Sequence, residues 1–172
     1  DAALKLARHR FDGIASAYPA EVAGATEAAV QETIERIRFT SELASAVQGA
    51  DLVIEAVPEN LELKRDIFAR IAAFAPPAAV VVTNSSSLLP SDLMESTGRP
   101  DRFLALHFAN HIWVNNIAEV MGSPRTDPGV YERVVAFAKE IGMVPIELHK
   151  EQPGYIVNSL LGPLLTAAAG LL

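Results

Sequence analysis

Three short apolar runs, separated by helical patterns, constrain the fold of this chain more than any other feature. The runs are DLVIEAV at 51–57, AVVVTN at 79–84 and FLALHFA at 103–109. None of them alternates apolar with polar residues, which is typical of parallel strands that are covered on both faces. Because such strands need a layer of helices on each side, the sequence predicts an α/β domain with a doubly wound, mostly parallel sheet.

Helical periodicity fills the segments around these runs. Apolar residues recur every three or four positions at 4–14, 30–37, 63–74 and 130–141. In the helix between the first two strands, the side chains expected to form the buried face are Leu63, Ile67, Ile71 and Phe74. Proline residues at 76 and 77 end that helix.

Capping residues and shorter elements complete the pattern. We expect Thr26 and Asp127 to cap the N-termini of the helices that follow them, and Gly142 to cap a C-terminus. The other predicted elements are two short helices, at 41–49 and 90–97, and two strands, at 117–122 and 144–149. Strands and helices therefore alternate through one domain.

Composition excludes several classes of protein. With 50% apolar and 20% charged residues, the chain is too hydrophobic to be disordered. Its 21 Asp and Glu outnumber 14 Lys and Arg, so we expect no nucleic-acid partner, because binding a phosphate backbone needs a basic face. There is no cysteine for a disulfide or a thiol nucleophile. The longest nearly uncharged stretch, 152–172, is broken by prolines and glycines, so we expect no membrane partner either.

The ends of the sequence predict a piece of a longer protein. It starts without Met inside a helical pattern and stops inside the apolar run GPLLTAAAGLL, with no cap. The polar link KEQPG at 150–154 predicts a domain boundary near residue 151. We therefore expect one domain at 1–150, and a linker with the first helix of a second domain at 151–172. No signal-peptide pattern is present, and a cytoplasmic protein is expected.

Polar side chains cluster where the predicted strands end. Serine residues at 85–87 follow the second strand, and His107 lies near the end of the third. Glu119 and Asn158 come later in the chain. Ligands of open α/β sheets bind outside the carboxyl ends of the strands. Hydroxyls, a carboxylate and an amide around one imidazole are the groups needed to orient a general base and bind an oxygen beside it.

Five segments in order carry a resemblance to a known family: ADLVIEAVPENLELK (50–64), TNSSSL (83–88), RPDRFLALHFAN (99–110), AEVMG (118–122) and QPGYIVNSLL (152–161). Together they resemble the 3-hydroxyacyl-CoA dehydrogenases, with their gulonate dehydrogenase and lambda-crystallin relatives. The resemblance implies an incomplete Rossmann-like domain, because the family's Gly-x-Gly-x-x-Gly turn precedes the helix where this sequence begins. It also implies that 154–172 is the first helix of an all-α C-terminal domain through which the full-length protein forms a homodimer.

The same resemblance implies an activity and a set of site residues. NAD is the cofactor, and a 3-hydroxyacyl-CoA, or alternatively a small 3-hydroxy acid, is the substrate. His107 resembles the general base and Glu119 the carboxylate that orients it, while Ser86 and Asn158 resemble groups around the reacting oxygen. The residues that match cofactor contacts are Glu59, Lys64, Ser86 and Asn110. Without the glycine turn, the chain on its own is expected to bind NAD poorly and to be inactive.

Two segments depart from the family's usual pattern. HIWVNN at 111–116 stands where prolines and a methionine are usual, so we expect Trp113 to change the wall near the substrate. Ser159 follows Asn158 where an arginine is common, which weakens an assignment specific for acyl-CoA.

Each site residue also has an ordinary structural explanation. Glu59 can complement the N-terminus of the helix that follows it, and Lys64 can be a solvated residue on that helix. The serines at 85–87 are typical turn residues, Asn158 suits a helix surface, and Glu119 suits an exposed strand position. The sequence leaves both explanations open.

Three other function classes compete with a dehydrogenase. A hydrolase would use Ser86 with His107, but NSSSL lacks the glycines that a nucleophile elbow needs. A metal site would use His107 and His111, but that spacing suits a helix whereas the pattern predicts a strand, so no metal is expected. The third is a non-catalytic protein on the same scaffold.

Overall fold

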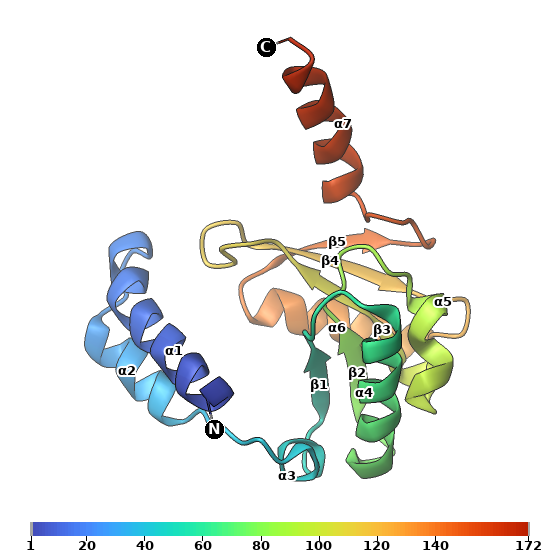
Figure 1. Ribbon diagram of the computed structural model, residues 1–172, viewed down its shortest axis with the longest axis horizontal. Helices are drawn as coiled ribbons and strands as arrows, with labels where there is room; N and C mark the ends of the chain where they lie inside the picture. The colour runs from blue at the N-terminus through green and yellow to red at the C-terminus, as the bar shows by residue number, and fades with distance from the viewer. Residues whose placement is uncertain (1, 172) are drawn as a thin grey trace.

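A five-stranded sheet forms the centre of the computed structural model, which describes residues 2–171 (Figure 1). The strands lie in chain order: β1 (Leu52–Glu55), β2 (Val80–Thr83), β3 (Phe103–Phe108), β4 (Ile117–Gly122) and β5 (Val144–Leu148). Every neighbouring pair is parallel except β3 and β4, which are antiparallel. The predicted α/β class with a mostly parallel sheet is confirmed.

Seven α-helices accompany the sheet within the described residues: α1 (Ala2–Glu21), α2 (Glu27–Glu35), α3 (Leu43–Val47), α4 (Leu61–Phe74), α5 (Pro90–Leu93), α6 (Pro128–Glu140) and α7 (Val157–Ala169). The expected caps are present. Thr26 and Asp127 side chains accept hydrogen bonds from the third backbone N–H beyond each of them, at 3.2 and 3.0 Å. Gly142 ends α6 with a φ of +83°, a conformation that glycine adopts without steric cost.

The sheet has a hydrophobic core on each face. On one face, α6 packs against β2, β3 and β4 through side chains such as Val134 and Leu106. On the other, α3, α4 and α5 cover β2 and β3, with Phe68 and Phe103 in edge-to-face contact at 5.0 Å between ring centres. Helices on both faces explain why β2 is buried at all four positions.

Two expectations about the first strand and its helix were wrong. β1 is an edge strand, and Ile54 is 42% exposed, so the run 51–57 is not covered on both faces. On α4 the buried side chains are Lys64, Phe68 and Ile71, whereas Leu63 and Phe74, expected inside, are exposed. The helix is turned by about one residue because it packs Lys64 against a buried carboxylate of β1.

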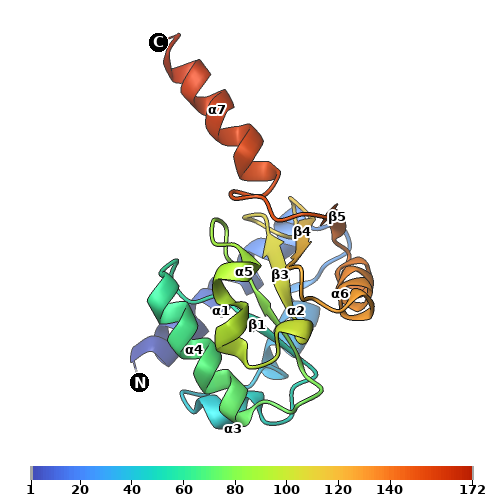
Figure 2. The ribbon, with the colours of Figure 1, turned by 90° about the vertical axis from the view of Figure 1, so that its right-hand side faces the viewer.

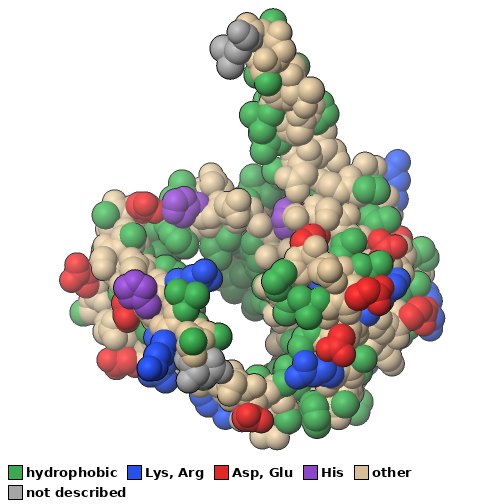
Figure 3. Space-filling view, in the orientation of Figure 1, with side chains coloured by type: hydrophobic (Ala, Val, Ile, Leu, Met, Phe, Trp, Pro, Cys, Tyr) green, Lys and Arg blue, Asp and Glu red, His purple; other side chains and the backbone are tan. Residues whose placement is uncertain are grey.

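Two parts of the chain stand outside the sheet layers. α1 and α2 pair with each other beside the sheet (Figure 1), and Phe11 meets Phe39 edge to face at 5.3 Å there. α7 projects away from the sheet (Figure 2) and has no buried residue. Figure 3 shows hydrophobic side chains along it, and its large exposed ones are Leu160, Leu161, Leu164 and Leu165.

Candidate active site

His107 and Glu119 face each other across the antiparallel pair of strands. They are register partners on β3 and β4, which puts their side chains on the same face of the sheet. Nδ1 of His107 lies 2.8 Å from Oε2 of Glu119, and the residues are only 9% and 1% exposed. A neutral imidazole that donates Nδ1–H to a carboxylate keeps the lone pair of Nε2 free to accept a proton. The pair therefore has the arrangement of an oriented general base.

The second oxygen of Glu119 is held by the start of α7. Oε1 accepts hydrogen bonds from the backbone N–H groups of Ile156 and Val157, at 2.7 and 2.9 Å. Unpaired N–H groups and the helix dipole favour negative charge at this position. Glu119 thus joins β4, β3 and the link into α7, and the prediction of an exposed strand carboxylate as its ordinary explanation is wrong.

Glu59 organises the serine loop after β2. Its Oε1 accepts five hydrogen bonds, from the hydroxyls of Ser85 and Ser87 and from the backbone N–H groups of Ser86, Ser87 and Leu88. Burial opposes ionisation of Glu59, but hydrogen bonds from Ser85 and Ser87 outweigh it and lower its pKa to about 2. The serines are therefore turn residues whose hydroxyl and N–H groups also bind a carboxylate.

Lys64 is buried rather than solvated. Its side chain is 1% exposed, and Nζ lies 2.8 Å from Oε1 of Glu55, 3.1 Å from the Val57 carbonyl and 3.4 Å from Oε2 of Glu59. Glu55 also accepts a hydrogen bond of 2.7 Å from the Thr83 hydroxyl. One ammonium thus joins two carboxylates, and the network ties the loop after β1 to the end of β2.

The three asparagines near this edge have different surroundings. Asn158 on α7 donates from Nδ2 to the Ser86 carbonyl at 3.3 Å, which brings the start of α7 to the serine loop. Asn84 accepts from the Phe108 N–H at 2.9 Å and fixes the end of β3. Asn110 is exposed, and its carbonyl accepts from Nδ2 of Asn115 at 2.9 Å.

The family profile described as "3-hydroxyacyl-CoA dehydrogenase, NAD binding domain" matches residues 1–152. The chain belongs to this family. NAD is the family's cofactor, and its members are oxidoreductases of the hydroxyacyl-CoA dehydrogenase type. The resemblance carried by the five sequence segments is therefore confirmed.

Three members of the 3-hydroxyacyl-CoA dehydrogenase family illustrate the range of similarity. Human mitochondrial hydroxyacyl-coenzyme A dehydrogenase is 39% identical over 83% of this chain and 45% of that protein. L-Carnitine dehydrogenase from a Pseudomonas species is 36% identical over 92% of this chain and 49% of that protein. The solved structure of a diketoreductase that acts on dicarbonyl compounds is 61% identical, with a TM-score of 0.95 over 98% of this chain and 60% of that one. The chain thus spans about half the length of the two curated relatives and 60% of the diketoreductase chain.

Sequence reasoning missed two buried residues of this dehydrogenase domain. Glu55 lies at the end of the observed strand β1, and a carboxylate inside such an apolar run signals a paired charge. Tyr155 is fully buried with its ring 5.0 Å from that of His107. Burial, together with the negative charges of Glu59 and Glu119, raises the pKa of the Tyr155 phenol. The glycine before it was the available signal of a special backbone turn.

The loop after β3, residues 110–116, contacts α1. The Trp113 ring lies 5.8 Å from the Tyr18 ring, and its Nε1–H donates to Glu21. His111, at φ +58°, stacks edge to face on Trp113 at 4.9 Å. The segment that departs from the family's usual pattern therefore joins the strand of His107 to the α1–α2 pair.

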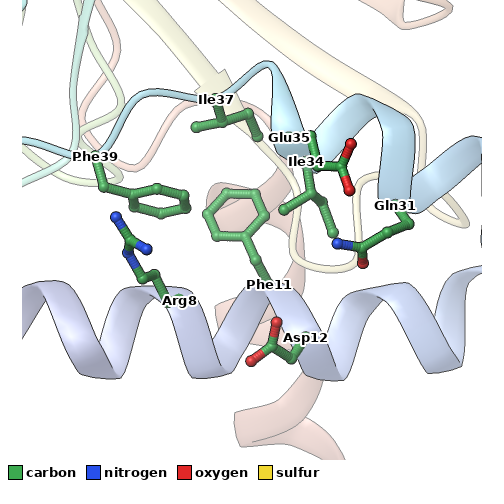
Figure 4. Close-up of a pocket in the computed structure, with 8 residues that line it drawn as sticks. All are labelled: Arg8, Phe11, Asp12, Gln31, Ile34, Glu35, Ile37 and Phe39. Carbon is green, nitrogen blue, oxygen red and sulfur yellow. The ribbon is translucent and has the colours of Figure 1, made fainter.

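Within residues 2–171, no group of three His, Cys, Asp or Glu is arranged to hold a metal ion. No helix there combines the length and apolar character needed to cross a membrane. A pocket of about 470 Å³ lies between α1 and α2 (Figure 4), where Arg8 stacks on Phe39 beside Phe11. Its lining includes neither His107 nor Glu119.

Proposed function

We propose that this chain supplies the general base and the NAD-facing edge of a dehydrogenase that oxidises the 3-hydroxyl of a 3-hydroxyacyl-CoA to a 3-oxo group. The observation that carries the proposal is the buried His107–Glu119 pair, whose Nδ1 and Oε2 are 2.8 Å apart. In the reaction, Nε2 of His107 takes the hydroxyl proton while C3 loses a hydride. Glu119 stabilises the imidazolium that forms. NAD, when bound, accepts the hydride.

The chain's own residues suit both the reacting oxygen and the cofactor. Asn158 and Ser86 are joined by a hydrogen bond and belong to the segments that flank the pair, as expected for groups around the substrate oxygen. Glu59 and Asn110 are exposed, and such groups fit ribose hydroxyls and an amide. Lys64 acts through Glu59 in this proposal, because its ammonium is buried against Glu55 and Glu59.

The test is turnover in the longest protein that carries this chain, followed as NADH formation. His107→Gln and Glu119→Gln are expected to lower kcat by ~10²–10⁴-fold, the range of general-base catalysis, with the Kd for NAD nearly unchanged. His149→Gln, which changes an exposed histidine after β5, is the matched control and keeps wild-type turnover. Wild-type turnover in His107→Gln would remove this histidine from the mechanism.

A second candidate substrate is a 3-hydroxy or dicarbonyl compound without CoA. The diketoreductase that acts on dicarbonyl compounds is 61% identical to this chain, against 39% for the human hydroxyacyl-coenzyme A dehydrogenase. Comparing kcat/KM for a 3-hydroxyacyl-CoA with that for its CoA-free ester separates the two candidates.

We further propose a domain boundary near residue 151, with the NAD-binding domain at 1–150 and a linker plus the first helix of the C-terminal domain at 151–172. The full-length protein is a homodimer through that second domain. A cytoplasmic location stays a prediction, because the human relative is named as mitochondrial.

A further inference from the structure

The link before α7 contains a residue whose burial the helix itself does not explain. Tyr155 is fully buried, yet α7, which begins two residues later, has no buried residue. The link runs over the edge of the sheet at the base of α7 (Figure 2). Tyr155 therefore packs on the sheet, where it shares a hydrophobic core cluster with Ala105, Met121 and Leu148, and not on α7.

Tyr155 contacts two parts of the candidate site through its side chain. The ring lies 5.0 Å from the His107 ring at an interplanar angle of 42°. The hydroxyl donates to the Leu88 carbonyl at 3.4 Å, and Leu88 is one of the residues whose N–H groups bind Glu59. One side chain thus lies against the imidazole and reaches the serine loop.

The backbone around Tyr155 is held in a conformation that its sequence does not favour. Gly154 has a φ of +74° and Tyr155 a φ of +55°, and a bulky residue adopts the left-handed region only where its surroundings impose it. This turn aims the N–H groups of Ile156 and Val157 at Oε1 of Glu119. The Ser159 hydroxyl donates to the Tyr155 carbonyl and closes the turn.

We propose that Tyr155 is a positioning residue for the His107–Glu119 pair. Its ring fixes the plane of the imidazole from one side, and the left-handed turn that it occupies delivers the two N–H groups that fix Glu119. This inference rests on the proposed role of His107 as general base, but the orientation of the ring is measurable without turnover.

The first experiment examines the imidazole in the 172-residue chain by long-range ¹H–¹⁵N NMR. In the wild type, His107 gives one tautomer, with the proton on Nδ1, because Glu119 accepts there. Tyr155→Leu is expected to give a mixture of tautomers or an exchange-broadened signal, and Tyr155→Phe, which keeps the ring, restores the wild-type signal. Phe103→Leu removes a fully buried ring at the other end of β3 and is the matched control. A wild-type signal in Tyr155→Leu overturns the proposal.

The second experiment measures kinetics in the longest protein that carries the chain. Tyr155→Leu is expected to lower kcat by about 10- to 100-fold, as a misaligned catalytic group does, with KM for NAD within about 2-fold of wild type. Tyr155→Phe and Phe103→Leu keep kcat within about 3-fold. Equal losses of kcat in Tyr155→Leu and Phe103→Leu would mean that Tyr155 is only a core residue.

Two outcomes keep this inference separate from the proposed function. If His107→Gln has wild-type turnover, the proposed function fails while the NMR result still decides whether Tyr155 orients the ring. If Tyr155→Leu does not fold by circular dichroism, Tyr155→Met, whose longer and more flexible side chain adapts to the same space without a flat ring, carries the same expectation in both experiments.

Discussion

Three glutamates near one edge of the sheet have different tasks because their partners differ. Glu119 meets an imidazole and a helix N-terminus, Glu59 accepts bonds from a serine loop, and Glu55 is paired with a buried ammonium. The sequence predicted the importance of Glu119 and Glu59 through their motifs. It did not predict Glu55 or Tyr155, because the local signals, a carboxylate within an apolar run and a glycine before the tyrosine, do not show which distant residues each side chain packs against.

Replacing Glu59 tests how much its hydrogen bonds with the serine loop contribute to stability, because that contribution depends on pH. The folded-state pKa of about 2 lies below the ordinary value of 4.5, so ionised Glu59 stabilises the fold above pH 4.5. That stabilisation is lost as the pH falls from 4.5 towards 2. Glu59→Gln is therefore expected to unfold at a lower urea concentration than wild type at pH 7. The difference between the two urea midpoints should narrow below pH 4.5. The expected difference in urea midpoint is moderate, because the Glu59 side chain is 34% exposed and its charge is screened by solvent.

Glu62→Gln serves as the control for that titration. Glu62 is 81% exposed and forms a salt bridge with Arg65 on the same helix, three residues away. Its variant should follow the wild-type curve at every pH. If the urea midpoint of Glu59→Gln stayed below that of wild type by the same amount from pH 7 to below pH 4, ionised Glu59 would not be what stabilises the serine loop.

Replacing Lys64 tests its buried ion pair with Glu55. Lys64→Met leaves Glu55 as a buried charge without its cation, and losing one partner of a buried pair costs about 3–5 kcal/mol of unfolding free energy. Lys64→Met combined with Glu55→Gln should recover part of that loss, because no net charge is then left unpaired between them. Lys5→Met, at an exposed position of α1, is the control. Equal urea midpoints for Lys64→Met and Lys5→Met would refute the buried pair.

At the level of elements, local signals predicted the order of helices and strands and the caps at Thr26, Asp127 and Gly142. They failed for the orientation of α4 and for the exposure of β1. The error for α4 arises because a periodic pattern treats Lys64 as polar and therefore outside, whereas its pairing with Glu55 turns it inward. β1 is exposed because it is an edge strand of the sheet. The reversed direction of β4 was equally invisible, although it is what sets Glu119 opposite His107.

The N-terminal cap of α6 contributes a measurable part of the stability of the fold. The Asp127 side chain accepts the Val130 N–H at 3.0 Å, and the helix it begins covers one face of the sheet. Asp127→Ala is expected to lower the free energy of unfolding by about 1 kcal/mol, a typical value for losing an N-cap. Asp127→Ser, which keeps a capping oxygen, should stay close to wild type. Identical chemical denaturation of the alanine and serine variants would argue against the cap.

The whole molecule combines a well-packed sheet with a helix, α7, that has no buried residue within the described part of the chain. α7 is connected to the sheet by the buried turn at Tyr155, while its leucines point into solvent, and contiguous exposed apolar surface of this kind marks an interaction site. This arrangement fits the predicted homodimer through the C-terminal part of the full-length protein.

The oligomeric state of the 172-residue chain tests that reading of α7. Leu160, Leu164 and Leu165 are 69%, 65% and 58% exposed, and burying them against a second copy removes apolar area from water. The chain is expected to elute larger than a monomer in size-exclusion chromatography with light scattering, increasingly so at higher concentration. Replacing these three leucines together by serine should give a monomer with unchanged urea stability, because none of them packs on the sheet. Leu6→Ser, at an exposed leucine of α1, is the control and should leave the association intact. A wild-type chain that stays monomeric at every concentration would show that this face does not associate with itself.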